Sequence, residues 1–108
     1  MKVSELTKYG LRLVSQDNGE DREIKDFYTG DLLSWVMGHV RGEDVCLLTV
    51  LNSINVIAVA TLVDLACIVF CEGVEPHQDI IDKANDEGVM LFVSDDTTFH
   101  TGLLLSKN

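Results

Sequence analysis

Basic residues are scarce in this 108-residue chain, which has 8 Lys and Arg against 18 Asp and Glu and a formal net charge of −10. Most of the negative charge lies in residues 55–108, where Lys83 and Lys107 are the only cations. A protein that binds nucleic acid needs a basic stripe that releases counterions from the phosphates. The composition therefore predicts no nucleic-acid partner and no binding to anionic membrane surfaces.

The sequence also lacks a long uninterrupted apolar run. Residues 45–71 are strongly apolar, but Asn52, Ser53, Asn55 and Asp64 divide them, and a membrane span needs about 20 mostly apolar residues. No apolar stretch follows Lys2 of the kind found in a signal peptide. We therefore expect a cytoplasmic protein with no membrane span.

The cysteines are few and odd in number, at Cys46, Cys67 and Cys71. They lie in apolar, β-branched segments, as reduced core thiols of a cytosolic protein do. In an extended strand, Cys67 and Cys71 would be about 13 Å apart, too far to share one zinc ion. The sequence thus predicts buried thiols, no metal site and no cofactor.

Motifs that support catalysis are missing. The chain has neither G-x-x-x-x-G-K-[ST] nor G-x-G-x-x-G, which cradle phosphates in kinases and dehydrogenases. Its three histidines are far apart and outside any Ser-His-Asp or Cys-His arrangement; they are His39, His77 and His100. We therefore predict no catalytic residue and a protein that is not an enzyme.

What the chain does contain is a regular alternation of apolar segments. With 46% hydrophobic residues and one proline, its size suits a single domain over residues 1–108. Strands are predicted at 11–15, 24–29, 45–51, 67–71 and 89–93, and helices at 3–9, 32–40, 55–65, 77–87 and after 97. In the last helix the apolar residues are Phe99, Leu103 and Leu104. This alternation predicts a three-layer α/β/α fold with a mainly parallel sheet.

Polar residues follow several predicted strands, at the edge where parallel α/β sheets bind ligands. Asp31 is placed to cap the helix over 32–40. The set has two interpretations: helix caps alone, or a small pocket for a ligand such as an adenine nucleotide. The hypothetical ligand-binding residues are Thr29, Gly30, Asp31, Asn52, Asn55, Asp95 and Thr98.

Trp35 and Met37 lie on the short helix predicted over 32–40. Tryptophan and methionine are enriched at interface centres, although a tryptophan in a small domain also serves as core. We take Trp35 and Met37 as a hypothetical interface and expect a homo-oligomer, most simply a dimer.

Several segments resemble the DRTGG domain. The loop Asp21-Arg22-Glu23-Ile24 carries the Asp-Arg pair, with Glu-Ile where the family name has Thr-Gly, and Tyr28-Thr29-Gly30-Asp31 follows. Residues 55–60 are similar to the central helix of that family, and residues 84–93 with 98–99 are similar to its closing strand and helix. The family includes inserts in CBS-domain pyrophosphatases and is similar to the N-terminal domain of HPr kinase/phosphorylase.

The resemblance implies a non-catalytic regulatory or protein-interaction module. Stand-alone members of the family imply a link to iron hydrogenase and to redox or energy metabolism, with a redox protein as partner. The alternative is a small-molecule sensor that binds an adenine nucleotide at the strand ends. Asp21 and Arg22 are interpreted as a structural pair, because a guanidinium group offers several planar donors that can hold a loop.

Overall fold

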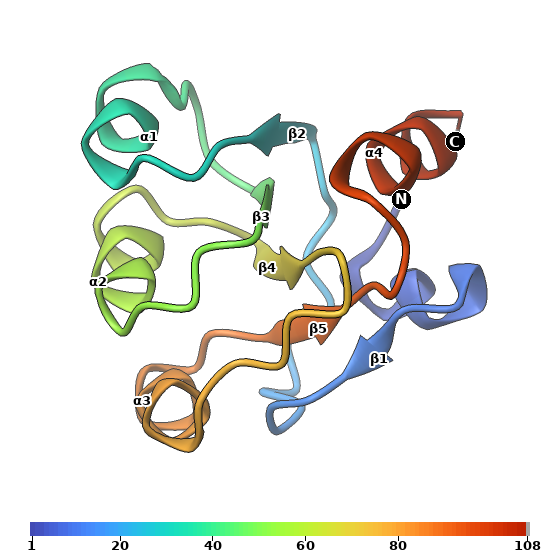
Figure 1. The fold of residues 1–108 in the computed structure, drawn as a ribbon. Coiled ribbons are helices and arrows are strands. Elements are labelled where there is room, and N and C mark those ends of the chain that lie inside the picture. Colours follow the sequence, from blue (N-terminus) through green and yellow to red (C-terminus); the bar gives the residue numbers. More distant parts are fainter. Residues whose placement is uncertain (108) are drawn as a thin grey trace.

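The computed structural model describes residues 1–107, and its centre is a five-stranded sheet with the order β1-β5-β4-β3-β2. Strands β2 to β5 are parallel, and β1 is antiparallel to β5 (Figure 1). The strands are β1 (Arg12–Leu13), β2 (Asp26–Thr29), β3 (Val45–Thr49), β4 (Cys67–Phe70) and β5 (Leu91–Val93). The helices are the 3₁₀ helix η1 (Val3–Tyr9), α1 (Leu33–His39), α2 (Asn55–Leu62), α3 (Gln78–Glu87) and α4 (Thr98–Ser106).

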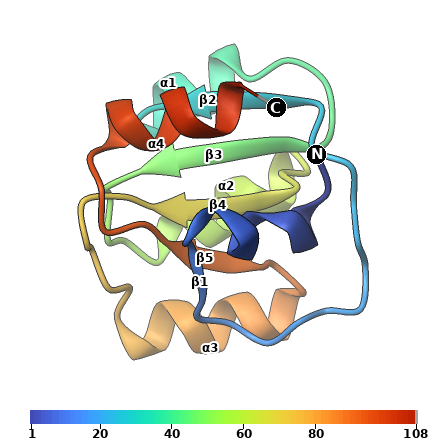
Figure 2. The same ribbon diagram turned by 90° about the vertical axis from the view of Figure 1, so that its right-hand side faces the viewer.

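The helices form two layers. Helices α1, α2 and α3 cover one face of the sheet, and α4 and η1 cover the other (Figures 1 and 2). The predicted α/β fold with a mainly parallel sheet is therefore confirmed. Within residues 1–107 we find no helix with the length and apolar character needed to cross a bilayer.

Strands β3 and β4 are buried along their whole length, because helices cover both of their faces. Alternate residues point to opposite faces, so the sheet separates two apolar clusters. The first packs beneath α1, α2 and α3 and contains Leu47, Ile68 and Phe70. The second packs beneath η1 and α4 and contains the three cysteines, Leu48 and Phe92.

Two elements differ from the sequence-based prediction. The strand predicted over 11–15 is reduced to Arg12–Leu13, and it pairs antiparallel with β5 at the edge of the sheet. The first helix is a 3₁₀ helix, which ends at Gly10 in the left-handed conformation with φ 88°. The remaining predicted elements are present with shorter bounds.

Helix α4 packs on the rest of the domain through one polar and one apolar contact. The buried hydroxyls of Ser94 and Thr101 are 2.7 Å apart and hydrogen-bonded. Leu105 is also buried, whereas Phe99 and Leu103 are exposed. The side of α4 with Thr101 and Leu105 thus faces the core, and much of the helix's apolar surface faces solvent.

Arg22 connects three segments that precede or follow the central strands. Its Nε donates to Asp44 Oδ1 at 2.6 Å, and its two terminal nitrogens donate to the backbone oxygens of Asp64 and Leu65, each at 3.0 Å. The neighbouring Asp21 accepts from the backbone nitrogen and the hydroxyl of Ser4. The Asp-Arg pair therefore holds the long loop before β2 against η1 and against the starts of β3 and β4.

Replacing Arg22 by Ala should destabilise the fold. The variant leaves two carbonyl oxygens without their side-chain donor, and a hydrogen bond that involves a charged group makes a net contribution of about 1.5–3 kcal/mol. We expect the free energy of unfolding in urea to fall by about 2 kcal/mol. The control Arg12→Ala removes a solvent-exposed ion pair with Glu75 and should change stability much less; equal losses in the two variants would contradict the assigned role of Arg22.

Stability should also fall in acid, because the fold lowers the pKa of several carboxyl groups. A hydrogen bond from Arg22 lowers the pKa of Asp44, and hydrogen bonds from Ser4 lower the pKa of Asp21. Their stabilising contribution is complete above the unfolded pKa of about 4 and is lost as pH falls through the lower folded pKa. Urea midpoints measured from neutral pH downward should decrease below about pH 4, and Asp44→Asn should make that decrease shallower; an unchanged acid slope in Asp44→Asn would refute the contribution of Asp44.

Candidate functional site

The carboxyl ends of β2, β3, β4 and β5 meet at one edge of the sheet, because these strands are parallel. The seven residues predicted to bind a ligand lie at the ends of these strands, in the loops that follow them or at the first position of the next helix. The loops after β2, β3 and β4 lead to helices on one face, and the loop after β5 leads to α4 on the other face (Figure 1). Whether the seven side chains meet depends on what each loop residue contacts.

Asp31 joins the loop after β2 to the end of β3. Its Oδ1 accepts from the buried Thr49 hydroxyl at 2.8 Å and from the Val50 backbone nitrogen at 2.9 Å. The expected cap of α1 is not formed: the residue before the helix is Leu32, and no side chain caps it. Asp31 is turned toward β3 instead, so its carboxylate connects two loops.

Asn52 makes a second connection between loops. Its Nδ2 donates to the Glu75 backbone oxygen and its Oδ1 accepts from the His77 backbone nitrogen, both at 3.0 Å. Both ends of the amide are thus used to hold the segment that leads into α3. Asn55 is exposed at the start of α2 and does not share this contact.

Two more predicted residues occupy separate positions. Asp95 is exposed and forms an ion pair with Arg12, with the nearest atoms 3.6 Å apart. Gly30 is packed so closely that an added Cβ would lie 3.1 Å from Val36 Cγ2 and 3.2 Å from a ring carbon of Tyr28. The need for a small residue at Gly30 thus comes from its packing against α1 and β2.

Thr29 and Thr98 are the two predicted residues that lie together. Both line an open groove between β2 and α4 with a volume of about 570 Å³. Thr98 also donates to Glu72 Oε2 at 3.4 Å. None of the lining residues is charged; they are Phe27, Thr29, Leu48, Thr98, Phe99, Gly102, Leu103 and Ser106.

Only some of the residues that line this groove could be recognised from the sequence. Phe99 and Leu103 were recognised as the apolar residues of the last helix, and their exposure is a tertiary result: 72% for Phe99 and 46% for Leu103. Phe27 gave no signal beyond an ordinary strand residue. The apolar composition of α4 is the sequence feature that could have indicated the groove, because this helix has more apolar side chains than one buried face can hold.

The two predicted interface residues, Trp35 and Met37, are both exposed on α1. The Trp35 ring is 56% exposed and stacks on His39, with ring centroids 3.8 Å apart. Helix α1 lies on one face beside β2, and α4 lies on the opposite face beside the same strand (Figure 2). Exposed aromatic groups therefore occur on the helices of both faces at the β2 edge of the sheet.

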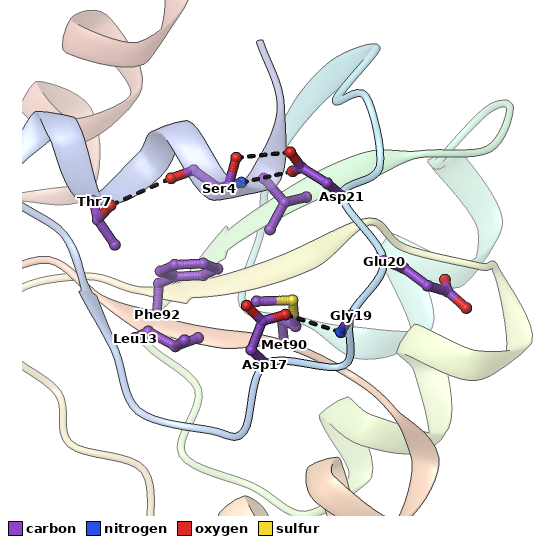
Figure 3. A pocket seen from close by; sticks show the side chains of 10 residues that line it. Ser4, Thr7, Leu13, Asp17, Gly19, Glu20, Asp21, Met90 and Phe92 are labelled. Carbon is purple, nitrogen blue, oxygen red and sulfur yellow. Dashed lines mark hydrogen bonds between the residues drawn. The ribbon is translucent and has the colours of Figure 1, made fainter.

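A second cavity, of about 320 Å³, lies under the loop that joins β1 to β2 and was not predicted. Met90, Phe92 and Leu13 form its apolar side, and the acidic loop residues lie along its rim (Figure 3). Asp17 Oδ1 accepts from the Gly19 backbone nitrogen at 2.9 Å. Asp17 is thus hydrogen-bonded within its own loop, as Asp21 is to Ser4.

The cysteines lie in the second apolar cluster. Cys46 and Cys67 are direct neighbours on β3 and β4, and all three thiols are buried. The contact with Cys67, together with burial, raises the pKa of the Cys46 thiol. Within residues 1–107, no group of three or more His, Cys, Asp or Glu side chains is arranged to hold a metal ion.

Comparison with known proteins identifies a structural relative. No protein-family model matches the sequence, and no curated protein matches it. The fold is similar to the crystal structure of the CBS and DRTGG domains of the regulatory region of Clostridium perfringens pyrophosphatase, solved with its activator diadenosine tetraphosphate. The TM-score is 0.70 at 8% identity, and the match covers 95% of this chain and 45% of that chain. At this identity the likeness establishes the fold alone, and it supports the predicted resemblance: in fold, the chain is DRTGG-like.

Proposed function

We propose that the chain is a non-catalytic regulatory module that binds a protein partner through the surface around β2. This surface, here named the β2 edge surface, comprises the groove between β2 and α4 together with the exposed side of α1. Its key side chains are Phe27, Thr29, Trp35, Phe99 and Leu103. The observation that carries the proposal is the groove, which is uncharged throughout in a chain with a net charge of −10.

Exposed aromatic and aliphatic groups support binding to a protein. Large apolar side chains gathered on one surface mark interaction sites on soluble proteins, and aromatic residues are enriched at interface centres. Phe99 and Trp35 each expose more than half of their surface. Their burial against a partner would remove apolar surface from water, which stabilises a complex by about 25 cal/mol per Å² before the costs of association.

The non-catalytic role is supported by how the polar strand-end residues are used. The side chains of Asp31 and Asn52 form hydrogen bonds that connect neighbouring loops. The structural neighbour is the regulatory region of its enzyme, which favours a regulatory role for a DRTGG-like fold. We extend the proposal to a single domain over residues 1–108 in the cytoplasm that acts in redox or energy metabolism, with a hydrogenase-related protein as a further partner.

Site-specific photo-cross-linking tests this proposal. A benzophenone side chain placed at position 99 should give covalent protein adducts in the native cells, because Phe99 lies on the proposed surface. The matched control is position 62, where Leu62 is 70% exposed on α2 and should give few adducts. Equal yields at both positions, or no adduct at position 99, would refute the β2 edge surface as a binding site.

A second function, binding of an adenine nucleotide, is favoured by one observation. Thr29 and Thr98 line the same groove as the rings of Phe27 and Phe99, and aromatic rings are common stacking partners for bases. The neighbouring regulatory region was solved with diadenosine tetraphosphate. In this candidate the base would lie in the groove, with the two threonine hydroxyls as its polar contacts.

Thermal unfolding with adenine nucleotides, diadenosine polyphosphates and Mg²⁺, each at about 1 mM, tests the second function. A ligand present at 100 times its dissociation constant adds about 2.7 kcal/mol, which should raise the midpoint by roughly 10 °C in a domain of this size. Thr98→Val, which keeps the side-chain shape, should reduce that shift. If none of these ligands raises the unfolding midpoint, the nucleotide-binding function is refuted.

A further inference from the structure

We propose that the partner of the β2 edge surface is a second copy of this chain, joined by antiparallel pairing of the two β2 strands across a two-fold axis. The inference rests on the proposed function, because it takes the same surface and names its occupant. Three features carry it: an open strand edge, apolar groups on both faces beside that edge, and the distribution of charge.

The outer edge of β2 is open. Strand β2 is last in the sheet order, and among residues 1–107 no strand pairs with its outer side. The segment Met1–Val3 pairs with Arg22–Ile24 and ends before Asp26. The Gly30 nitrogen donates inward to the Leu48 oxygen at 3.2 Å, so the alternation of the strand directs the amide groups of Phe27 and Thr29 outward.

One of the two outward amide groups, that of Phe27, already has a hydrogen-bond acceptor in its own chain. Asp26 Oδ1 accepts from the Phe27 backbone nitrogen at 2.8 Å. A charged side chain on an edge strand is a common way to moderate pairing with another chain. In the dimer this local hydrogen bond is exchanged for one to the partner strand, while the Thr29 amide group pairs directly.

The symmetry of an antiparallel pair matches the surroundings of β2. A two-fold axis perpendicular to the sheet keeps the two α1 helices on one face and the two α4 helices on the other. Phe99 and Leu103 of one copy then face α4 of the second copy, and the two α1 helices approach each other on the opposite face. A lone peptide strand would fill the groove but leave the helices of the other face uncovered, which favours a second copy as the occupant.

Charge also favours this surface and this orientation. Two chains with a net charge of −10 repel, so a contact between them must avoid carboxylates. Neither Leu33–His39 nor Thr98–Ser106 contains an acid, whereas α3 contains four. An antiparallel pair centred on Tyr28 sets Asp26 opposite Gly30 of the other copy, whereas parallel pairing in register would set the two Asp26 residues side by side.

Sedimentation velocity of the full chain over a range of concentrations tests the inference. We expect a dimer of twice the 12.0 kDa chain mass. Thr29→Pro removes an outward amide hydrogen without removing a hydrogen bond between β2 and β3, and Leu103→Asp places a charge in the groove. Each should weaken dimerisation by about tenfold or more, while the control Leu62→Asp should leave the dissociation constant within about twofold of the unmodified chain.

A variant that tightens the dimer separates an effect on the interface from an effect on folding, because an unfolded chain would not gain affinity for its partner. Asp26→Ala removes the carboxylate that competes for the Phe27 amide hydrogen and should tighten the dimer by about threefold or more. Asp26→Asn removes the same charge but keeps the acceptor oxygen, so it should tighten the dimer less. If Asn and Ala tighten it equally, charge alone is responsible and strand pairing is refuted.

The remaining outcomes separate this inference from the proposed function. A chain that stays monomeric at all concentrations overturns the dimer, as does a dimer that is insensitive to both Thr29→Pro and Leu103→Asp. In either case, cross-linked adducts from position 99 with a mass other than twice the chain would leave the interaction module standing with a different partner. Absence of adducts together with a monomer would overturn both.

Discussion

The whole structure depends on covering β3 and β4 on both faces. Every residue of these two strands is buried, and their apolar side chains alternate between the two sides of the sheet. A strand of this kind is stable only between two layers, because either uncovered face would expose several large side chains to water. Helices α1 to α3 supply one layer, and η1 with α4 supplies the other.

Helix α4 in the second layer exposes part of its apolar surface. Helix α4 lies close to the sheet at Gly102, where an added Cβ would be 3.4 Å from Leu48, and it is oriented by the hydroxyl pair of Ser94 and Thr101. Buried hydroxyls need hydrogen-bond partners to avoid a desolvation cost, and Leu105 is buried on the same side of the helix. Phe99 and Leu103 are consequently directed away from the core, beside the open edge of β2.

The loops at the carboxyl end of the sheet are stabilised by contacts with each other more than by helix caps. Asp31 and Asn52 each connect one loop to the next, and Arg22 does the same at the opposite end of the strands. These polar connections join neighbouring loops at both ends of the strands. The surface around β2 instead carries exposed apolar side chains, and the proposed binding site lies there.

The sequence by itself determined the α/β class, the mainly parallel sheet and most of the elements, because apolar periodicity and turn residues are local signals. It also indicated the DRTGG-like fold through the segments around Arg22 and Gly30. Only the tertiary structure decided which strand is last in the sheet, which side of α4 faces the core, and that Thr29 lies near Thr98 while Asn55 and Asp95 lie apart. Those outcomes depend on contacts between residues distant in the chain, such as Asp31 with Thr49 and Asn52 with Glu75, and no local pattern encodes them.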